Sequence, residues 1–151
     1  MALVLNEEQV MLRDAARGFL SAQAPVEHLR KLRDEGKDEG VSRELWSEIV
    51  DMGWAAILVP EEYGGLGYGF TGIGLVLEEC GRTLTPSPLL SSSMVASAAI
   101  ARFGDEKQKS TYLPALASGE QLLALVQAAD RLVQHQRVNE LFSTNYIYCI
   151  N

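Results

Sequence analysis

A glycine pattern is the first feature of this 151-residue chain that could do chemistry. Gly67–Gly72 reads G-Y-G-F-T-G and matches G-x-G-x-x-G, with which a strand–turn–helix unit cradles a dinucleotide pyrophosphate. That interpretation requires the glycines directly after a strand and an acidic residue about 20 positions further on. Here the turn-rich segment Pro60–Gly65 intervenes, and the later position holds Ser91–Ser93. We therefore interpret the match as a coincidence and the glycines as turn residues.

Two pairs of adjacent acids are the next candidates for catalysis. Glu61 with Glu62, and Glu78 with Glu79, carry the carboxylates that general acid–base chemistry uses. Nothing in the sequence pairs these acids with a base or a pocket. Paired acids on a loop or an exposed helix face are usually solvated or cap a helix, so we expect no catalytic role for them.

The cysteines and histidines predict neither a disulfide framework nor a metal site. Cys80 lies in an apolar helical run and is expected to be a small core residue, whereas Cys149 is near the C-terminus. His28 and His135 are far apart and have no partners at metal-ligand spacing. We assign no metal ligand.

Composition favours an ordinary globular protein. Hydrophobic residues make up 47% and charged residues 22% of the chain, and the net charge of −7 argues against nucleic acid or an anionic membrane as partner. No apolar run reaches the roughly 18 residues of a membrane span, and the N-terminal residues do not form a basic-then-apolar signal region. We expect a cytoplasmic protein with no membrane span.

Capping and breaking residues divide the first 120 positions into about six helices. Asn6 opens a capping box with Gln9, and Ser42 and Asp105 are further N-cap candidates. Short connections between these helices predict an all-α bundle, with Gln121–Val126 as a strand or extended exit. The expected helices run from Asn6 through Leu20, from Pro25 to about Glu35, from Ser42 to Gly53, from about Phe70 to Gly81, from about Ser87 to Phe103, and briefly after Asp105, before Tyr112–Pro114.

The fifth expected helix is rich in small residues, notably Ser91–Ser93 and Ala96–Ala99. Small side chains let another backbone or a slender ligand approach closely. Tight packing between helices and one wall of a slot for a slender ligand both remain open on this pattern.

Composition changes sharply after Gly119. All 13 glycines and all 5 prolines lie at or before it. The remaining 32 residues have only Asp130, Asn139, Asn145 and Asn151 to form turns, so they cannot build a β-barrel. Asp130 could cap a helix in this tail. Tyr146–Ile150 is an uncharged, β-prone run that would be an aggregation hazard if it were exposed.

Several segments together resemble the N-terminal helical domain of acyl-CoA dehydrogenases. The likeness covers about residues 3–126 in family-like order and spacing. Its anchors are Gly53-Trp54 with Val59–Gly67, Glu7–Gln9 with Leu12–Asp14 and Ala24-Pro25, Leu77–Arg82 with Pro86 and Pro88, and Phe103-Gly104 with Tyr112–Pro114 and Gly119-Glu120.

The resemblance implies an FAD-dependent oxidoreductase that converts acyl-CoA to 2,3-enoyl-CoA and passes electrons to an electron-transfer flavoprotein. In that family a middle β domain and a C-terminal helical domain follow, and the latter supplies the carboxylate base. The N-terminal domain shapes the acyl pocket. By position, the resemblance assigns Ser87, Leu90, Ser91 and Met94 to the closed end of that pocket.

The likeness stops before the flavin-contacting motif. Where the family has a Thr-Glu-x-x-x-Gly-Ser-Asp type sequence, this chain reads Gln127-Ala128-Ala129-Asp130. We therefore divide the chain into a family-like α domain, 1–126, and an unrelated tail, 127–151, either helical or disordered, and assign no catalytic or cofactor-binding residue.

We expect the chain to be truncated relative to the family and inactive alone, without bound FAD. Two alternatives remain: a non-catalytic module that docks on a full-length dehydrogenase subunit as a homo- or hetero-oligomer, and a frame-shifted relic.

Overall fold

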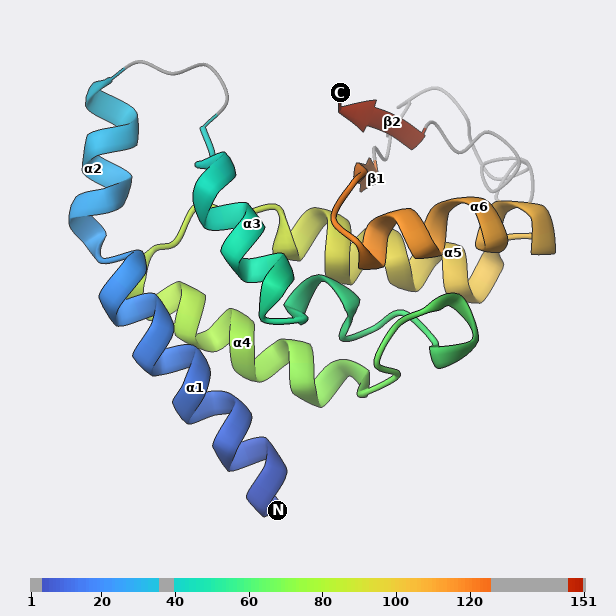
Figure 1. Ribbon diagram of the computed structural model, residues 1–151, viewed down its shortest axis with the longest axis horizontal. Coiled ribbons are helices and arrows are strands. Elements are labelled where there is room, and N and C mark those ends of the chain that lie inside the picture. Colours follow the sequence, from blue (N-terminus) through green and yellow to red (C-terminus); the bar gives the residue numbers. More distant parts are fainter. Residues whose placement is uncertain (1–3, 36–39, 126–146, 151) are drawn as a thin grey trace, which may run out of the picture.

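The computed structural model describes residues 4–35, 40–125 and 147–150. In this part of the chain the helices follow one another with short connections, and the all-α prediction is confirmed (Figure 1). The helical elements are α1 (Glu7–Gln23), α2 (Val26–Asp34), α3 (Arg43–Asp51), the 3-10 turns η1 (Trp54–Ala56) and η2 (Glu61–Tyr63), α4 (Gly69–Thr83), the π-helix η3 (Leu89–Ala96), α5 (Ser97–Phe103) and α6 (Glu106–Ala117).

The predicted N-caps begin their helices as expected. The Asn6 side chain accepts from the Gln9 backbone N–H at 2.8 Å, and the Gln9 side chain accepts from the Asn6 N–H at 3.1 Å. Asp105 forms the same box at α6, and Ser42 Oγ accepts from the Leu45 N–H at 3.1 Å. These contacts satisfy first-turn amides that have no partner within the helix.

Two helices differ from the sequence-based expectation. The fifth expected helix is not uniform, because its first eight residues, Leu89–Ala96, form a π-helix before the α-helical α5 begins. The sixth continues through Pro114 and ends at Ala117. Proline removes the hydrogen bond to the carbonyl four residues earlier, that of Ser110, and both Ser110 and Pro114 are exposed residues.

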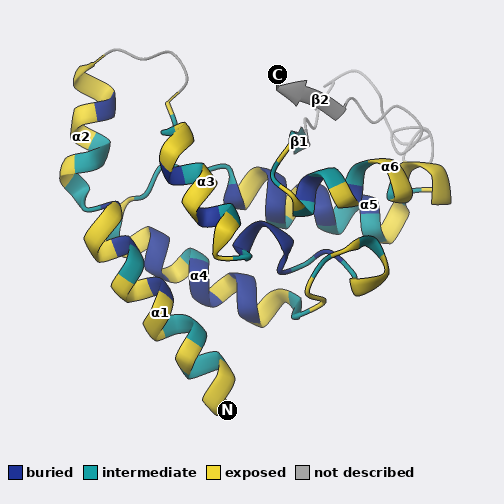
Figure 2. Ribbon diagram, viewed as in Figure 1, coloured by how far each residue is buried: buried dark blue, intermediate teal, exposed yellow. Residues whose placement is uncertain are grey.

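Two hydrophobic clusters form the core. Figure 2 marks the buried positions along the ribbon in dark blue. The first lies where α1 packs on α4 and includes Leu20 and Trp54, whose indole meets the Phe19 ring edge-on at 5.3 Å. The second lies between η3, α5 and α6. We call them the first and second core clusters; the first is built around Ala16, Leu20, Ile49, Trp54, Ile57, Ile73, Val76 and Leu89, and the second comprises Val59, Ala96, Ile100, Leu113, Leu116 and Leu123.

A two-stranded sheet follows α6. β1 (Leu122–Leu125) pairs antiparallel with β2 (Ile147–Ile150), with Leu122 opposite Ile150 and Leu125 opposite Ile147. The predicted exit segment is thus a strand, and the β-prone run near the C-terminus supplies its partner. The helix proposed after Asp130, His135, most of the polar loop before Gly40 and the boundary at 126 lie outside the described residues.

Candidate functional site

The residues assigned to the acyl pocket gather on and just before the π-helix. Leu90 and Ser91 are exposed on η3, Met94 is half-buried one turn further on, and Ser87 is half-buried before the helix begins. Ser91 Oγ donates to the Pro88 carbonyl at 3.3 Å. Met94 packs against the first core cluster. The four residues therefore lie along one short segment. Leu90 and Ser91 are the two that are exposed at its surface.

Buried serines hold this π-helix in place. Ser92, Ser93 and Ser97 are each almost fully buried. Ser97 Oγ donates to the Ser92 carbonyl at 3.3 Å, and Ser92 Oγ accepts from the backbone N–H of Leu123 in β1 at 3.1 Å. A buried hydroxyl needs such hydrogen-bond partners. The buried serines therefore stabilise the packing of η3, whether or not the exposed serine binds a ligand. The hydrogen bond between Ser92 and Leu123 joins residues 31 positions apart, and no pattern in the sequence predicted it.

The glycine-dense turn after α3 is held by its own backbone. The N–H groups of Leu66, Gly67 and Tyr68 donate to the carbonyls of Ala56, Val59 and Ile57 at 2.9–3.0 Å. A Cβ added to Gly65 would lie 2.0 Å from the Val59 carbonyl oxygen. Only glycine lets these two backbone segments approach so closely.

The G-x-G-x-x-G match does not form a dinucleotide cradle. η2 stands before the glycines in place of a strand, and α4 begins at Gly69. A Cβ on Gly72 would lie 2.2 Å from the Tyr68 ring, and the Glu61 side chain lies against Gly67. An aromatic ring fills the space and a carboxylate stands beside it, where a phosphate needs open amides. These glycines do not fit the pyrophosphate of a flavin dinucleotide, and we derive no step through that group.

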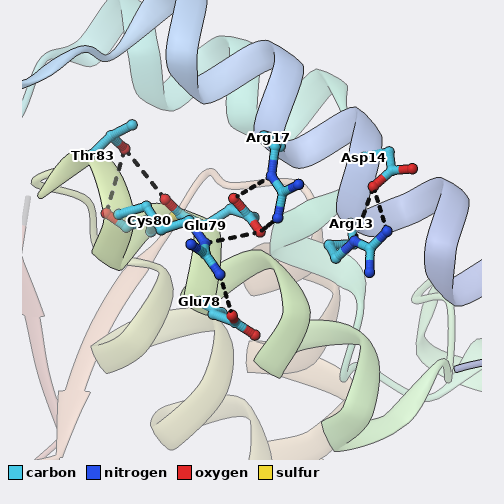
Figure 3. A network of polar contacts seen from close by, with 8 residues as sticks. Arg13, Asp14, Arg17, Glu78, Glu79, Cys80 and Thr83 are labelled. Atoms are coloured by element: carbon cyan, nitrogen blue, oxygen red, sulfur yellow. Dashed lines mark hydrogen bonds and ion pairs between the residues drawn. The ribbon is translucent and has the colours of Figure 1, made fainter. Parts of the chain in front are cut away.

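One member of the acidic pairs is buried, contrary to the expectation of a solvated or capping role. Glu79 is 2% exposed and accepts from Arg17 of α1 through two bonds, at 2.9 and 3.2 Å (Figure 3). Arg82, on the next turn of α4, approaches the same carboxylate at 3.3 Å and bonds Glu78 at 2.8 Å. This network joins α1 to α4. Nothing in the sequence identified Arg17 as the partner of Glu79.

The network keeps Glu79 ionised. The hydrogen bond from Arg17 lowers the pKa of the Glu79 carboxyl, against an opposing effect of burial, and the positive charges of Arg17 and Arg82 lower it further. The same hydrogen bond raises the pKa of the Arg17 guanidinium. A carboxylate held ionised by two arginines accepts no proton near neutral pH, so the pair links helices and is unsuited to act as a base.

The remaining polar candidates are structural or solvated. Cys80 is buried, as expected, and burial raises the pKa of its thiol to about 11, so it stays protonated and unreactive. Glu61 and Glu62 are exposed. The Tyr63 hydroxyl donates to Glu106 at 3.0 Å, which joins η2 to α6.

Residues 4–35, 40–125 and 147–150 contain neither a metal cluster nor a membrane-spanning helix. There, no three His, Cys, Asp or Glu residues lie together so as to suit a metal ion. No helix in the described ranges has both the length and the apolar character needed to cross a bilayer.

Known proteins resemble this chain in both sequence and fold. Bovine (Bos taurus) mitochondrial isovaleryl-CoA dehydrogenase is 36% identical over 129 residues, which is 82% of this chain and 29% of the relative. The ChsE4–ChsE5 complex from Mycobacterium tuberculosis contains a chain with TM-score 0.73 and 29% identity, covering 82% of this chain and 34% of that one. A Bacillus anthracis acyl-CoA dehydrogenase complexed with FAD matches with TM-score 0.66 and 30% identity, over 80% of this chain and 21% of that one.

The match to the family is confined to its N-terminal part. The chain spans 29% of the length of its bovine relative. The family model described as "Acyl-CoA dehydrogenase, N-terminal domain" matches residues 6–120, which contain every helix from α1 to α6. The chain therefore belongs to the acyl-CoA dehydrogenase family, and residues 6–120 are its N-terminal helical domain.

Proposed function

We propose that this chain provides the N-terminal helical domain of an FAD-dependent acyl-CoA dehydrogenase, and that η3 forms one wall of its acyl pocket. The observation that carries the proposal is the exposed pair Leu90 and Ser91 on a π-helix anchored by buried serines. π-helical turns occur frequently at functional sites. The apolar Leu90 side chain suits an acyl chain, and the two smaller neighbours Ser87 and Ser91 leave it room.

We further propose that the 151-residue polypeptide is inactive by itself and holds no FAD. None of the residues described above fits the flavin. Glu79, the buried carboxylate, is unsuited to act as a base because it pairs with two arginines. FAD, acyl-CoA oxidation and electron transfer to a flavoprotein partner then depend on residues that the family carries beyond this domain. FAD would supply the hydride acceptor in that complete enzyme.

Activity and flavin content of the purified polypeptide test the second proposal. We expect no flavin absorbance at visible wavelengths and no dye reduction when acyl-CoA of any chain length is added. FAD retained at one equivalent, or acyl-CoA-dependent dye reduction, would overturn it.

Binding measured by NMR tests the acyl wall independently of activity. Titration of the ¹⁵N-labelled polypeptide with a medium-chain acyl-CoA should shift the amides of Ser87, Leu90, Ser91 and Met94, whereas coenzyme A alone should not. Leu90→Ser should weaken these shifts, and Phe103→Ser, which alters an equally exposed side chain at the end of α5, should not. Identical shifts with coenzyme A, or shifts confined to other elements, would count against the acyl wall.

A second function, docking on a full-length dehydrogenase subunit, is supported by exposed apolar side chains. Leu90, Val95 and Phe103 are exposed along η3 and α5, and exposed apolar patches often mark interaction sites. One structural relative belongs to a complex of two proteins, ChsE4 and ChsE5. Co-expression with a full-length acyl-CoA dehydrogenase distinguishes the functions, since docking predicts co-elution that Leu90→Ser or Phe103→Ser weakens.

A further inference from the structure

Strand β1 has two backbone edges, and different parts of the chain cover them. The Leu123 N–H donates to Ser92 Oγ at 3.1 Å, so this edge of β1 faces η3. Successive N–H groups of a strand point to opposite edges. The N–H groups of Leu122 and Ala124 therefore lie on the other edge, which pairs with β2 (Figure 1).

The edge that β2 covers has the features of a strand that pairs readily with other strands. β1 reads LLAL and contains no charge and no proline, the residues with which exposed strand edges usually prevent association. Within the described residues, β2 is the strand that pairs with this edge. β2 reads IYCI and is also uncharged. Each strand thus covers an association-prone backbone edge of the other.

We propose that β2 is a tethered cap that prevents β1 from pairing with a second copy of this chain. Two identical strands that pair antiparallel form a two-fold symmetric contact, so a second copy can offer its own β1 to the same edge. The second copy would pair with the edge of β1 that β2 covers, because the other edge is bonded to Ser92. This inference concerns association of the domain and does not depend on acyl or flavin binding.

Proline placement in β2 tests the proposal through the backbone alone. Register puts Tyr148 opposite Ala124, so the Tyr148 N–H points toward β1, whereas the N–H of Cys149, the next residue, points away. Tyr148→Pro removes a donor from the shared edge, and Cys149→Pro, the matched control, removes one from the outer edge, where proline is tolerated. We expect amide exchange at Ala124 to become roughly tenfold faster or more in Tyr148→Pro only.

Oligomeric mass is the second measurement. In reducing buffer, Tyr148→Pro should increase in mass toward a dimer as its concentration rises, while Cys149→Pro should behave as the unaltered protein does. Ser92→Ala should speed amide exchange at Leu123 without changing the mass, since it alters only the edge of β1 that faces η3.

Three results would overturn the proposal. They are unchanged exchange at Ala124 in Tyr148→Pro, equal effects of both prolines, and a freed Ala124 amide in a protein whose mass does not rise. If Tyr148→Pro lowers the helical circular dichroism, Tyr148→Gly replaces it, since glycine weakens a strand without removing the N–H.

Discussion

The buried carboxylate of Glu79 is the residue that the structure reinterprets most. Adjacent acids on a helix suggested a solvated face, yet one of the two is enclosed and bonded to Arg17 across the α1–α4 contact. Its neighbour Glu78 remains exposed and pairs with Arg82 along the same helix. Two identical residue types, one position apart, thus differ by a rotation of about 100° around the helix axis.

Glu79→Gln should destabilise the domain. Glutamine keeps the shape but loses the charge that Arg17 bonds, and the expected loss is about 1–3 kcal/mol of unfolding free energy. Urea unfolding followed by circular dichroism measures it. Glu78→Gln is the matched control, with an expected change within about 0.5 kcal/mol. Equal losses in the two variants would show that the Arg17 bond contributes little.

Acid should remove the same contribution. The folded-state pKa of Glu79 is lowered, so below its unfolded value of about 4.3 the unfolded state binds more protons than the folded one. The Glu79 contribution is therefore fully present above that value and is lost as pH falls through the lowered folded pKa. The difference in urea midpoint between the unaltered protein and Glu79→Gln should shrink over this interval. A difference that stays constant down to pH 3 would argue against the ionised pair.

At the scale of elements, the connection between α3 and α4 has a shape that its own backbone hydrogen bonds determine. The turn from α3 to α4 keeps its shape through backbone bonds between Ala56–Val59 and Leu66–Tyr68. In the sequence this stretch identified the family, and its glycines were interpreted as turn residues. The structure agrees and adds the reason for one of them: Gly65 lies against the Val59 carbonyl, a contact that no local pattern reveals.

Gly65→Ala should disrupt this turn. The added methyl group would overlap the Val59 carbonyl oxygen, and the expected loss is about 1–3 kcal/mol, as for other overpacked sites. Thermal unfolding measures it.

Gly74→Ala is the control for that change. Gly74 lies on the exposed side of α4, and a Cβ there meets nothing within 4 Å. Alanine should stabilise the helix by about 0.5–1 kcal/mol. A neutral Gly65→Ala would show that the turn relaxes easily.

At the scale of the whole molecule, the two core clusters are linked by segments that contribute to both. Ile57 belongs to the first cluster and Val59, two residues later, to the second. η3 contributes Leu89 to the first and Ala96 to the second, so a single helix crosses both. We infer that neither cluster can lose its packing without exposing the other.

The domain should therefore unfold in one transition. Leu20→Ala in the first cluster and Leu113→Ala in the second should each lower stability by about 2–5 kcal/mol. Fluorescence reports the first cluster through Trp54 and Trp46, and circular dichroism reports all helices; their midpoints should coincide in both variants. Separate midpoints in Leu113→Ala would show that the second cluster unfolds independently.

The sequence by itself determined the local structure and the family. Caps at Asn6, Ser42 and Asp105 act over a few residues, so the starts of α1, α3 and α6 could be predicted from neighbouring positions. The family resemblance rests on several short segments, of which Gly53–Gly67 is one, and each is visible in neighbouring positions of the sequence.

Only the tertiary structure decided which distant groups meet. Arg17 and Glu79 are 62 positions apart, and Ser92 and Leu123 are 31 apart. Such contacts depend on how helices cross and which faces are enclosed, and no pattern in a single chain records a crossing angle. The π-helical turn of η3 was missed because it accompanies contacts made only after folding: Ser92 Oγ accepts from the Leu123 N–H of β1, and Ser97 Oγ donates to the Ser92 carbonyl. The pairing of β1 with β2 is likewise a contact between distant residues, which the sequence of either strand does not reveal.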